Sequence, residues 1–278
     1  MMDLTIIIVS FKSGKILDRC LNSIDSKYPV IVMENSQDQS LKVNLEKNYS
    51  NVKCFLTEEN LGYGKANNLG LKNVRTKYAL ILNPDATLES STLENFLAIA
   101  KNNSDFAIIG PEEQEKSSSL KKRNNNDLIK VENVKGFAMF LNLEQFKEVG
   151  FFDENFFIYF EEIDLCKRLS KFNKKIYLSP LIKINHLGAQ SHDESINKNM
   201  ELSRNWHWMW STFYFNKKHF GFFFSLIKVS KKFFSSFIKM IYFSIIFKEK
   251  ERRIYYQRVS GLFNSIIGKK SWYRPKIT

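Results

Sequence analysis

The first 110 residues alternate short runs of β-forming apolar residues with segments of helical spacing, and this alternation restricts the fold more than any other feature of the chain. Strands that alternate with helices form parallel sheets with crossover connections. The pattern therefore predicts an α/β fold with a Rossmann-like first half. The expected strands are 4–11, 30–33, 52–56 and 78–82, and the expected helices are 14–24 and 64–73.

Polar residues stand at the carboxyl ends of these expected strands. Ser10 ends the first strand, Glu34 to Ser36 follow the second, and Asn83 to Asp85 follow the fourth. Ligands of open parallel sheets bind outside the carboxyl ends of the strands. The pattern therefore predicts a binding site at this edge.

The second half begins with a polar stretch, residues 112–133. We interpret it as a mobile loop, either a tolerated surface insertion or a lid that orders on a substrate. The segments after it predict strands at 137–141, 176–178 and 182–184, and helices at 143–149 and 160–172.

Acidic residues after an aromatic run are candidates for catalysis. Glu161, Glu162 and Asp164 open the helix expected after residues 156–160. Acids in a first turn also complement the helix dipole, which is a structural explanation. Apolar surroundings raise the pKa of a carboxyl group, as a general base requires. Arg168, four residues after Asp164, can neutralise that carboxylate.

Metal-binding candidates are few. Asp85 after Pro84 is consistent with a turn or a helix cap as well as with a ligand. His186 follows an expected strand, and no two of the four histidines have the spacing of a zinc site. The three cysteines are far apart, which excludes a disulfide framework and a thiolate zinc site and predicts a reducing, cytoplasmic setting.

Several ordered motifs together resemble family 2 glycosyltransferases, most closely bacterial rhamnosyltransferase-like members that build surface polysaccharides. The resemblance covers about residues 4–220. The motifs of the first half are Val9 to Phe11, Glu34 to Asp38, Asn60 to Gly70 and Leu82 to Asp85. Those of the second half are Gly136 to Met139, Gly150 to Leu169 and His186 to Gly188.

The resemblance implies a GT-A fold and inverting transfer from a nucleoside diphosphate sugar. It implies that Glu162 is the catalytic base and that Asp85 and His186 hold Mg²⁺ or Mn²⁺. The donor site would include Ser10, Glu34, Asn60, Gly62, Lys65, Asn68, Asn83 and Asp85. The substrate site would include Gly136, Glu161, Asp164 and Arg168.

Three positions depart from the family pattern. Asn83 replaces the first Asp of the metal motif, Glu34 replaces an Asp after the second strand, and Glu162 replaces the usual base Asp. The longer side chain at position 162 adds roughly one carbon–carbon bond of ~1.5 Å. A misplacement of about 1 Å can cost on the order of 100-fold in rate.

The basic charge of the chain lies in its last quarter. Residues 211–278 hold 15 of the 42 Lys and Arg but 2 of the 29 acids, so they carry the whole net charge of +13. They also hold 12 of the 25 Phe. Basic charge mixed with large apolar side chains is typical of proteins at an anionic membrane surface and not of nucleic-acid binding.

A helical wheel of residues 226–241 places Lys228, Lys231, Lys232 and Lys239 on one arc and bulky apolar residues opposite. This predicts an amphipathic helix that lies in the membrane interface. The alternative is a helix that packs on the catalytic domain or on a second subunit, and a homo-oligomer through these helices is compatible with it. The most apolar segment, 233–247, is too short to span a bilayer and contains Lys239. No secretory signal is visible at the N-terminus.

These observations predict a GT-A domain at 1–210 and a basic amphipathic tail at 211–278. Within the domain, 1–110 would bind the nucleotide sugar, 111–135 would be the mobile loop, and 136–210 would hold the acceptor and the base. The expected function is metal-assisted transfer of a sugar, such as rhamnose, to a lipid-linked or growing glycan on the inner face of a bacterial cell membrane. The alternatives are a sugar-phosphate nucleotidyltransferase and a non-catalytic glycan-binding relative.

Overall fold

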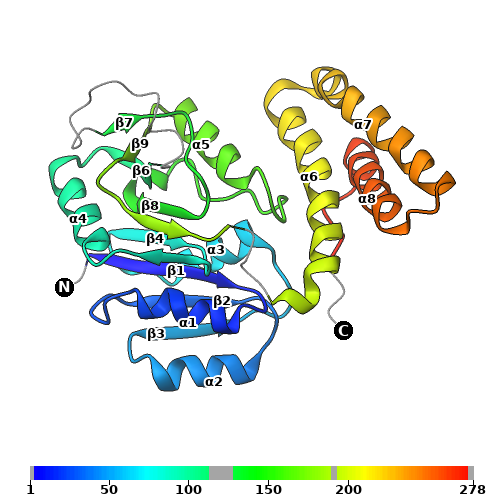
Figure 1. Cartoon of the computed structure of the whole chain (residues 1–278). Helices are drawn as coiled ribbons and strands as arrows, with labels where there is room; N and C mark the ends of the chain where they lie inside the picture. The colour runs from blue at the N-terminus through cyan, green and yellow to red at the C-terminus, as the bar shows by residue number, and fades with distance from the viewer. Residues whose placement is uncertain (1–2, 113–127, 189–192, 275–278) are drawn as a thin grey trace. The chain divides into compact units, whose positions relative to one another are not determined.

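The computed structural model describes residues 3–112, 128–188 and 193–274 (Figure 1). The chain forms two compact units. Unit 1 consists of Met1–Phe152 and Glu162–Asp193, and unit 2 of Asp153–Glu161 and Glu194–Thr278. The division of functions among the predicted segments of the chain stays a prediction.

Unit 1 is built on an eight-stranded mixed sheet of order β3-β2-β1-β4-β8-β6-β9-β7. Its first four strands in this order are parallel, β8 runs antiparallel to both β4 and β6, and β9 is parallel to β6. The strands are β1 Leu4–Ser10, β2 Val30–Glu34, β3 Val52–Leu56, β4 Tyr78–Leu82, β6 Phe106–Pro111, β7 Ile129–Lys130, β8 Ala138–Asn142 and β9 Lys175–Ser179. A second sheet pairs β5 Ala86–Leu88 with β10 Ile184–His186 in antiparallel orientation.

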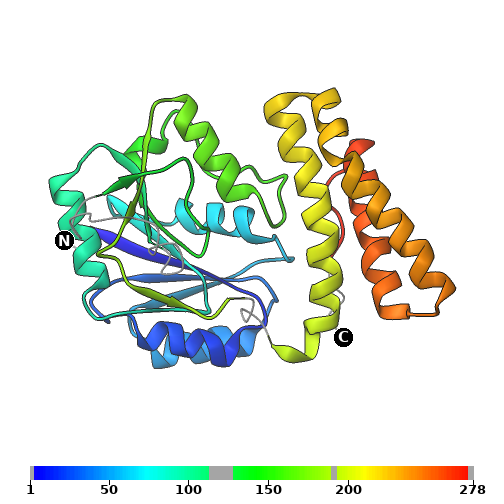
Figure 2. The same ribbon diagram turned by 45° about the horizontal axis from the view of Figure 1, so that its top comes forward.

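Helices cover both faces of the large sheet. Strand β1 shows why: Ile6 packs into one core cluster with α1, α2 and α4, whereas its neighbour Ile7 packs into the other with α3 and α5. Figure 2 shows α1 and α2 below the sheet and α3 above it. The helices are α1 Gly14–Asn22, α2 Gln39–Asn48, α3 Tyr63–Lys72, α4 Thr92–Asn102, α5 Glu161–Lys171 and the 3₁₀ turns η2 Leu143–Phe146 and η3 Glu194–Ile196.

The predicted fold class is confirmed, with differences in detail. Helices α2 and α4 and strand β6 were not predicted, and the strand expected at 182–184 lies at Ile184–His186. Helix α2 buries Leu45 alone among its residues, so its apolar spacing is weak. A cap was available as a signal, because Asp38 accepts a hydrogen bond from Leu41 N. Of the predicted loop at 111–135, residues 113–127 lie outside the described part of the chain, and Ile129–Lys130 form β7.

Unit 2 is helical, and Figures 1 and 2 show its three long helices side by side. They are α6 Asn197–Phe220, α7 Phe222–Ile245 and α8 Glu249–Ile266. Gly261 brings α8 against α6, since a Cβ at this position would lie 2.1 Å from the carbonyl oxygen of Trp206. None of the helices in the described ranges combines the length and the apolar character that a membrane span requires.

Candidate active site

The carboxyl ends of β1, β2 and β4 meet at one edge of the large sheet, as predicted. Ser10 pairs in register with Glu34. Asn83 N donates to Phe137 O at 2.8 Å, so the chain that enters β8 lies beside the end of β4. This edge therefore collects residues that are distant in the sequence.

Glu34 is completely buried and organises the loop after β2. Its carboxylate accepts hydrogen bonds from the backbone N–H groups of Ser36 and Asp38, both at 2.9 Å, and from the Ser36 hydroxyl. Asn35 links this loop to the next one by donating to Gly62 O at 3.0 Å. Ser10 Oγ is buried at the same edge and has no hydrogen-bond partner among the described residues. A ligand at this edge would find a rigid carboxylate and a buried hydroxyl.

The segment before α3 forms a tight turn. Asn60 Oδ1 accepts from Gly62 N at 3.0 Å, and Gly62 has φ +76°, which favours glycine. Lys65 lies half-buried on the first turn of α3. Asn68 is engaged within the fold, because its side chain donates to Phe152 O at 2.9 Å and accepts from Phe152 N at 3.0 Å. Its amide holds the segment that leads into unit 2.

Asp85 and His186 lie side by side. Pairing of β5 with β10 places His186 opposite Ala86, and Leu187 N donates to Asp85 O at 3.1 Å. His186 Nε2 is 3.3 Å from Asp85 Oδ1. The Asp85 side chain is 1% exposed and the imidazole 27% exposed. The structure thus brings together the two residues predicted to hold a metal ion.

An aromatic ring, a buried thiol and a buried amide oxygen lie near the pair of Asp85 and His186. The Phe137 ring stacks on the His186 imidazole with centroids 4.3 Å apart and planes 5° from parallel. Cys20 Sγ lies 3.7 Å from Asn83 O, and burial, with a further contribution from the Asp85 charge, raises the pKa of the Cys20 thiol to about 12. Asn83 Oδ1 is buried without a hydrogen-bond partner in the part of the chain that the structure describes.

Glu162 lies at the same edge. A Cβ built on Gly136 would contact both Cβ and Cγ of Glu162 at 3.7 Å, and Tyr63 donates its hydroxyl to Gly136 O. Glu162 Oε2 is buried, with no hydrogen-bond partner among the described residues. Burial raises the pKa of the Glu162 carboxyl, and the backbone amides of Glu162 and Ile163 together with Lys135 offset part of the rise.

The backbone immediately before α5 is strained. Tyr159 and Phe160 have φ values of +69° and +71°, which bulky side chains rarely adopt. Such strain persists only where the surrounding structure enforces it, and it is concentrated at functional sites. Glu161, which follows directly, is 6% exposed.

Asp164 and Arg168 contact the loop before unit 2. The buried Asp164 carboxylate accepts from Arg168 Nε at 2.8 Å. Arg168 also donates to Val149 O at 2.9 Å and to Phe151 O. These contacts hold that loop in place, and a direct role of the pair toward a substrate stays a prediction.

The dipeptide Gly136–Phe137 is the meeting point of the site. A Cβ at Gly136 would touch Glu162, and the Phe137 ring stacks on His186, which lies beside Asp85. Tyr63 and Phe137 belong to the recognised motifs, but their contacts were not predicted. An aromatic residue after Gly136 at the start of a strand was the available signal for the ring stack.

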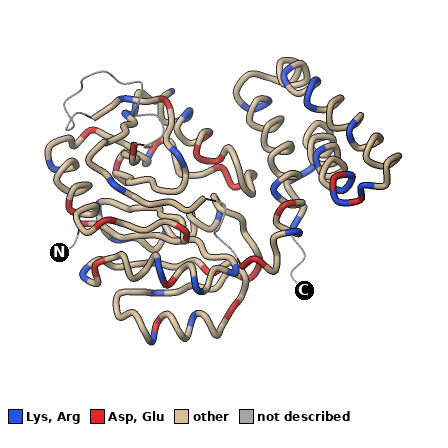
Figure 3. The backbone as a smooth tube through the Cα atoms, viewed as in Figure 1, with Lys and Arg blue, Asp and Glu red and all other residues tan. Residues whose placement is uncertain are grey.

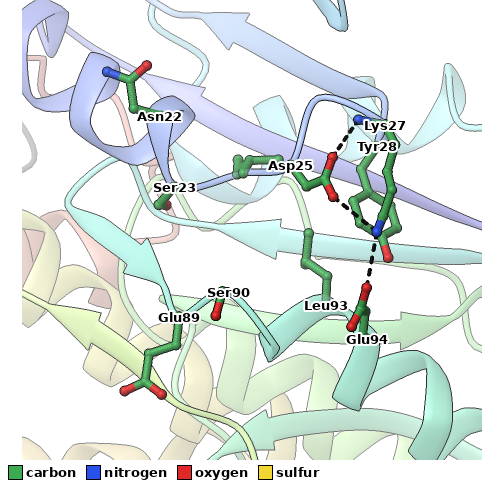
Figure 4. A pocket seen from close by; sticks show the side chains of 10 residues that line it. Asn22, Ser23, Asp25, Lys27, Tyr28, Glu89, Ser90, Leu93 and Glu94 are labelled. Carbon is green, nitrogen blue, oxygen red and sulfur yellow. Dashed lines mark hydrogen bonds and ion pairs between the residues drawn. The ribbon is translucent and has the colours of Figure 1, made fainter.

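A separate pocket of about 280 Å³ lies between the loop that enters β2 and the start of α4. Figure 4 shows Lys27 between Asp25 and Glu94. Lys27 Nζ lies 3.0 Å from the Asp25 carboxylate and 3.1 Å from the Glu94 carboxylate. None of the predicted site residues lines it. The candidate active site is therefore the edge described above and not this pocket.

Comparison with known sequences identifies the family of the chain. The sequence model of Glycosyl transferase family 2 matches residues 5–166. The low-salt glycan biosynthesis hexosyltransferase Agl10 of Haloferax volcanii is 24% identical over 198 residues, which are 63% of this chain and 64% of that protein. The rhamnosyltransferase WbbL of Escherichia coli strain K12 is 24% identical over 212 residues, which are 64% of this chain and 80% of that protein. The chain thus spans less than two thirds of the length of the Haloferax relative.

Solved structures share the fold. The crystal structure of S. aureus TarS 1–349 has a TM-score of 0.54 at 14% identity and covers 98% of this chain and 93% of its own. The crystal structure of GalNAc-T7 with UDP, GalNAc and Mn²⁺ has a TM-score of 0.57 at 15% identity and covers 67% of this chain and 44% of its own. At these identities the likeness shows the fold, and the fold is of the GT-A type.

Proposed function

The chain belongs to glycosyl transferase family 2, and on that premise we propose that it transfers a sugar from a nucleoside diphosphate sugar to a glycan hydroxyl with inversion at the anomeric carbon. The observation that carries the proposal is the half-buried Glu162 side chain, whose buried Oε2 has no hydrogen-bond partner among the described residues. It lies against Gly136, next in the chain to the Phe137 ring that stacks on His186.

Glu162 would act as the general base. Its carboxylate accepts the proton of the acceptor hydroxyl while that oxygen forms a bond to the anomeric carbon, and the bond from this carbon to the diphosphate oxygen breaks. A raised pKa makes the carboxylate a stronger proton acceptor at neutral pH. Partial burial, which raises this pKa, also keeps Oε2 away from bulk solvent.

Asp85 and His186 fit a divalent ion. A carboxylate oxygen and an imidazole nitrogen 3.3 Å apart are ligand types that Mn²⁺ accepts, and oxygen ligands are those that Mg²⁺ prefers. Among the described residues no group of three or more His, Cys, Asp and Glu could hold a metal. The remaining ligands would be donor diphosphate oxygens and water. The ion would supply positive charge to the departing diphosphate.

The donor and acceptor are proposed by analogy. The relative WbbL is named a rhamnosyltransferase and Agl10 a hexosyltransferase, and a TarS 1–349 structure is a complex with UDP-GlcNAc. We propose a hexose or deoxyhexose donor such as rhamnose, carried on a nucleoside diphosphate. The acceptor would be a lipid-linked or growing glycan, and the enzyme would act at the inner face of a bacterial cell membrane.

A donor panel tests the proposal. Purified protein is titrated calorimetrically with nucleoside diphosphate hexoses and deoxyhexoses in Mn²⁺ and in EDTA, and donor turnover is followed with and without a lipid-linked glycan acceptor. The expected result is Mn²⁺-dependent binding of one donor and its transfer. Donor binding without turnover would favour the non-catalytic relative. Release of pyrophosphate from a nucleoside triphosphate and a sugar phosphate would favour the nucleotidyltransferase.

A further inference from the structure

One face of α7 carries six large apolar side chains that point away from the other helices of unit 2. Their exposed fractions range from 44% to 80%. They are Phe223, Ile227, Phe234, Ile238, Ile241 and Ile245. At 100° per residue they occupy an arc of about 60° on the helix. We call this set the apolar stripe.

The opposite side of α7 supplies its packing within unit 2. Val229 and Ser236 are buried there, and Leu226 and Phe233 pack against a core cluster that includes Phe213 of α6 and Leu262 of α8. The apolar arc predicted from the sequence is thus divided in two. One part packs on α6 and α8, and the other part forms the stripe.

The stripe is long for a surface without a partner. From residue 223 to residue 245 it extends over about 33 Å at 1.5 Å per residue. Soluble proteins rarely expose contiguous apolar patches beyond a few hundred Å², and larger ones mark interaction sites. The stripe therefore predicts a partner with an apolar surface.

Exposed lysines lie on one side of the stripe. With Phe223 at 0° the stripe ends at about 60°, and Lys231, Lys228 and Lys239 lie at about 80°, 140° and 160°. Lys239 Nζ also lies 5.3 Å from the centroid of the Tyr255 ring of α8. Figure 3 shows Lys and Arg along all three helices of unit 2. Residues 211–278 carry 15 Lys and Arg against two acids. A partner must therefore offer an apolar layer with negative charge beside it.

We propose that the apolar stripe of α7 docks into the interface of an acidic phospholipid membrane. The stripe enters the acyl boundary, and the lysines on that side of the helix, Lys231 nearest to the stripe, contact anionic headgroups. A second copy of the chain fits less well, because a twofold contact through this face would bring two lysine-rich helices of net positive units together. The inference rests on the proposed function in one respect: membrane docking would hold the enzyme at the surface where a lipid-linked acceptor lies.

Sedimentation with vesicles is the first test. The full chain is mixed with phosphatidylglycerol–phosphatidylcholine vesicles and with pure phosphatidylcholine vesicles, at low salt and at about 0.5 M NaCl, where charges are screened within a few Å. We expect binding to the acidic vesicles at low salt, with at least a tenfold weaker partition on neutral vesicles or in high salt.

A stripe variant and a matched control distinguish binding through the apolar stripe from non-specific hydrophobic binding to vesicles. The stripe variant carries Ile227→Ser, Phe234→Ser and Ile238→Ser. The control carries Val43→Ser and Phe172→Ser, which remove apolar side chains of unit 1 that are 56% and 51% exposed. The stripe variant should lose at least tenfold in partition, whereas the control should bind like the wild type. Tryptophan fluorescence checks that unit 2 of the stripe variant is folded, because all four tryptophans lie in unit 2.

A single probe reports depth. The native Cys20, Cys54 and Cys166 are buried, so an environment-sensitive fluorophore can be attached at Ile238→Cys or, as a control, at Val43→Cys. With acidic vesicles the emission maximum of the fluorophore at position 238 should shift to shorter wavelength, and spin-labelled acyl chains should quench its fluorescence. The probe at 43 should do neither.

Two results would overturn the inference. One is wild-type protein that stays in the supernatant with acidic vesicles at low salt. The other is a stripe variant that binds vesicles as the wild type does. A wild-type dimer that the stripe substitutions convert to a monomer, without vesicle binding, would assign the face to a second copy instead. Donor titration of the stripe variant keeps the two proposals apart, since lost lipid binding with retained donor binding concerns the stripe alone.

Discussion

The imidazole ring of His186 lies flat on the phenyl ring of Phe137, with centroids 4.3 Å apart and planes 5° from parallel. One ring belongs to β10 of the small sheet, and the other immediately precedes β8 of the large sheet. The stack fixes the imidazole so that its Nε2 stays 3.3 Å from Asp85 Oδ1. A packed ring is thus a positioning residue for a proposed metal ligand.

Removal of either proposed ligand should weaken Mn²⁺-dependent donor binding to different degrees. Asp85→Ala removes formal charge and a ligand, so it should weaken binding more than His186→Ala does. Phe137→Leu should weaken it by about tenfold, the lower end of the 10- to 100-fold loss typical of residues that orient a metal ligand. Calorimetric titration with donor in Mn²⁺ and in EDTA measures all three. Equal wild-type affinity in the two conditions would remove the metal from the proposal.

Glu162→Gln should abolish transfer and leave donor binding nearly unchanged. The substitution keeps the volume and removes the proton acceptor, so turnover should fall by about 100-fold or more. Glu161→Gln should be milder. Glu162→Asp gives the side chain the length that is usual in the family. It keeps a carboxylate and so tests whether the longer glutamate side chain is needed for activity. Retention of more than about a tenth of wild-type turnover by Glu162→Gln would contradict the assignment.

The raised pKa of Glu162 predicts opposite effects of pH on activity and on stability. The base works when deprotonated, so kcat/KM should fall on acidification at a pH above the ordinary value of ~4.3 for glutamic acid. The folded state holds this proton more tightly than the unfolded state does. Its stability contribution is therefore greatest at low pH and is lost as pH rises through the folded pKa. Glu162→Gln should accordingly raise the midpoint of thermal unfolding at neutral pH, and the difference should vanish on acidification.

Much of the site's location could be predicted from the sequence, whereas its internal contacts could not. Ser10, Glu34 and Asp85 follow strongly apolar strands, and parallel topology alone brings such ends to one edge. The antiparallel insertion of β8 between β4 and β6 depends on chain paths far apart in the sequence, and so does the contact of Gly136 with Glu162. Glu162 was found through the resemblance, since three acids in a first turn also have a purely structural explanation.

Helix α7 shows the same limit of prediction from sequence. Its wheel predicts one apolar arc, and a single sequence cannot tell which part of that arc meets neighbours. The structure answers this because α6 and α8 bury Val229 and leave Ile227 77% exposed. The periodicity of α7 can be calculated from its own sequence, whereas the burial of its side chains also depends on how α6 and α8 pack against it.

Gly261→Ala should destabilise unit 2 selectively. The added Cβ would lie 2.1 Å from Trp206 O and 2.9 Å from Trp206 C, which are backbone atoms that a side-chain rotation cannot move away. Overpacking of this kind costs about 1–3 kcal/mol or more. Urea unfolding followed by tryptophan fluorescence should show a lower midpoint. Gly14→Ala in unit 1 is the control for selectivity: nothing lies within 4 Å of its added Cβ, and the fluorescence midpoint of unit 2 should stay at the wild-type value. An unchanged midpoint in Gly261→Ala would contradict the close approach of α8 to α6.

His207 should make unit 2 sensitive to acid. The ring is fully buried on α6, Nε2 donates to Tyr273 O at 2.7 Å, and Nδ1 accepts from Ser271 Oγ at 3.0 Å. Burial lowers the pKa of His207 to about 3, with Arg274 contributing in the same direction. In the unfolded chain the pKa is ~6.5, so between these values the unfolded state binds the extra proton. Unit 2 should therefore keep its full stability above about pH 6.5 and lose ~1.4 kcal/mol per pH unit on acidification toward pH 3.

His207→Gln should be less stable at pH 7, because it loses the ring stack on Phe157, but its unfolding midpoint should depend less on pH. Urea titrations between pH 4 and pH 7, read by tryptophan fluorescence, measure both slopes, with His219→Gln as the matched control that keeps the wild-type slope. A wild-type slope retained in His207→Gln would show that other groups cause the acid sensitivity.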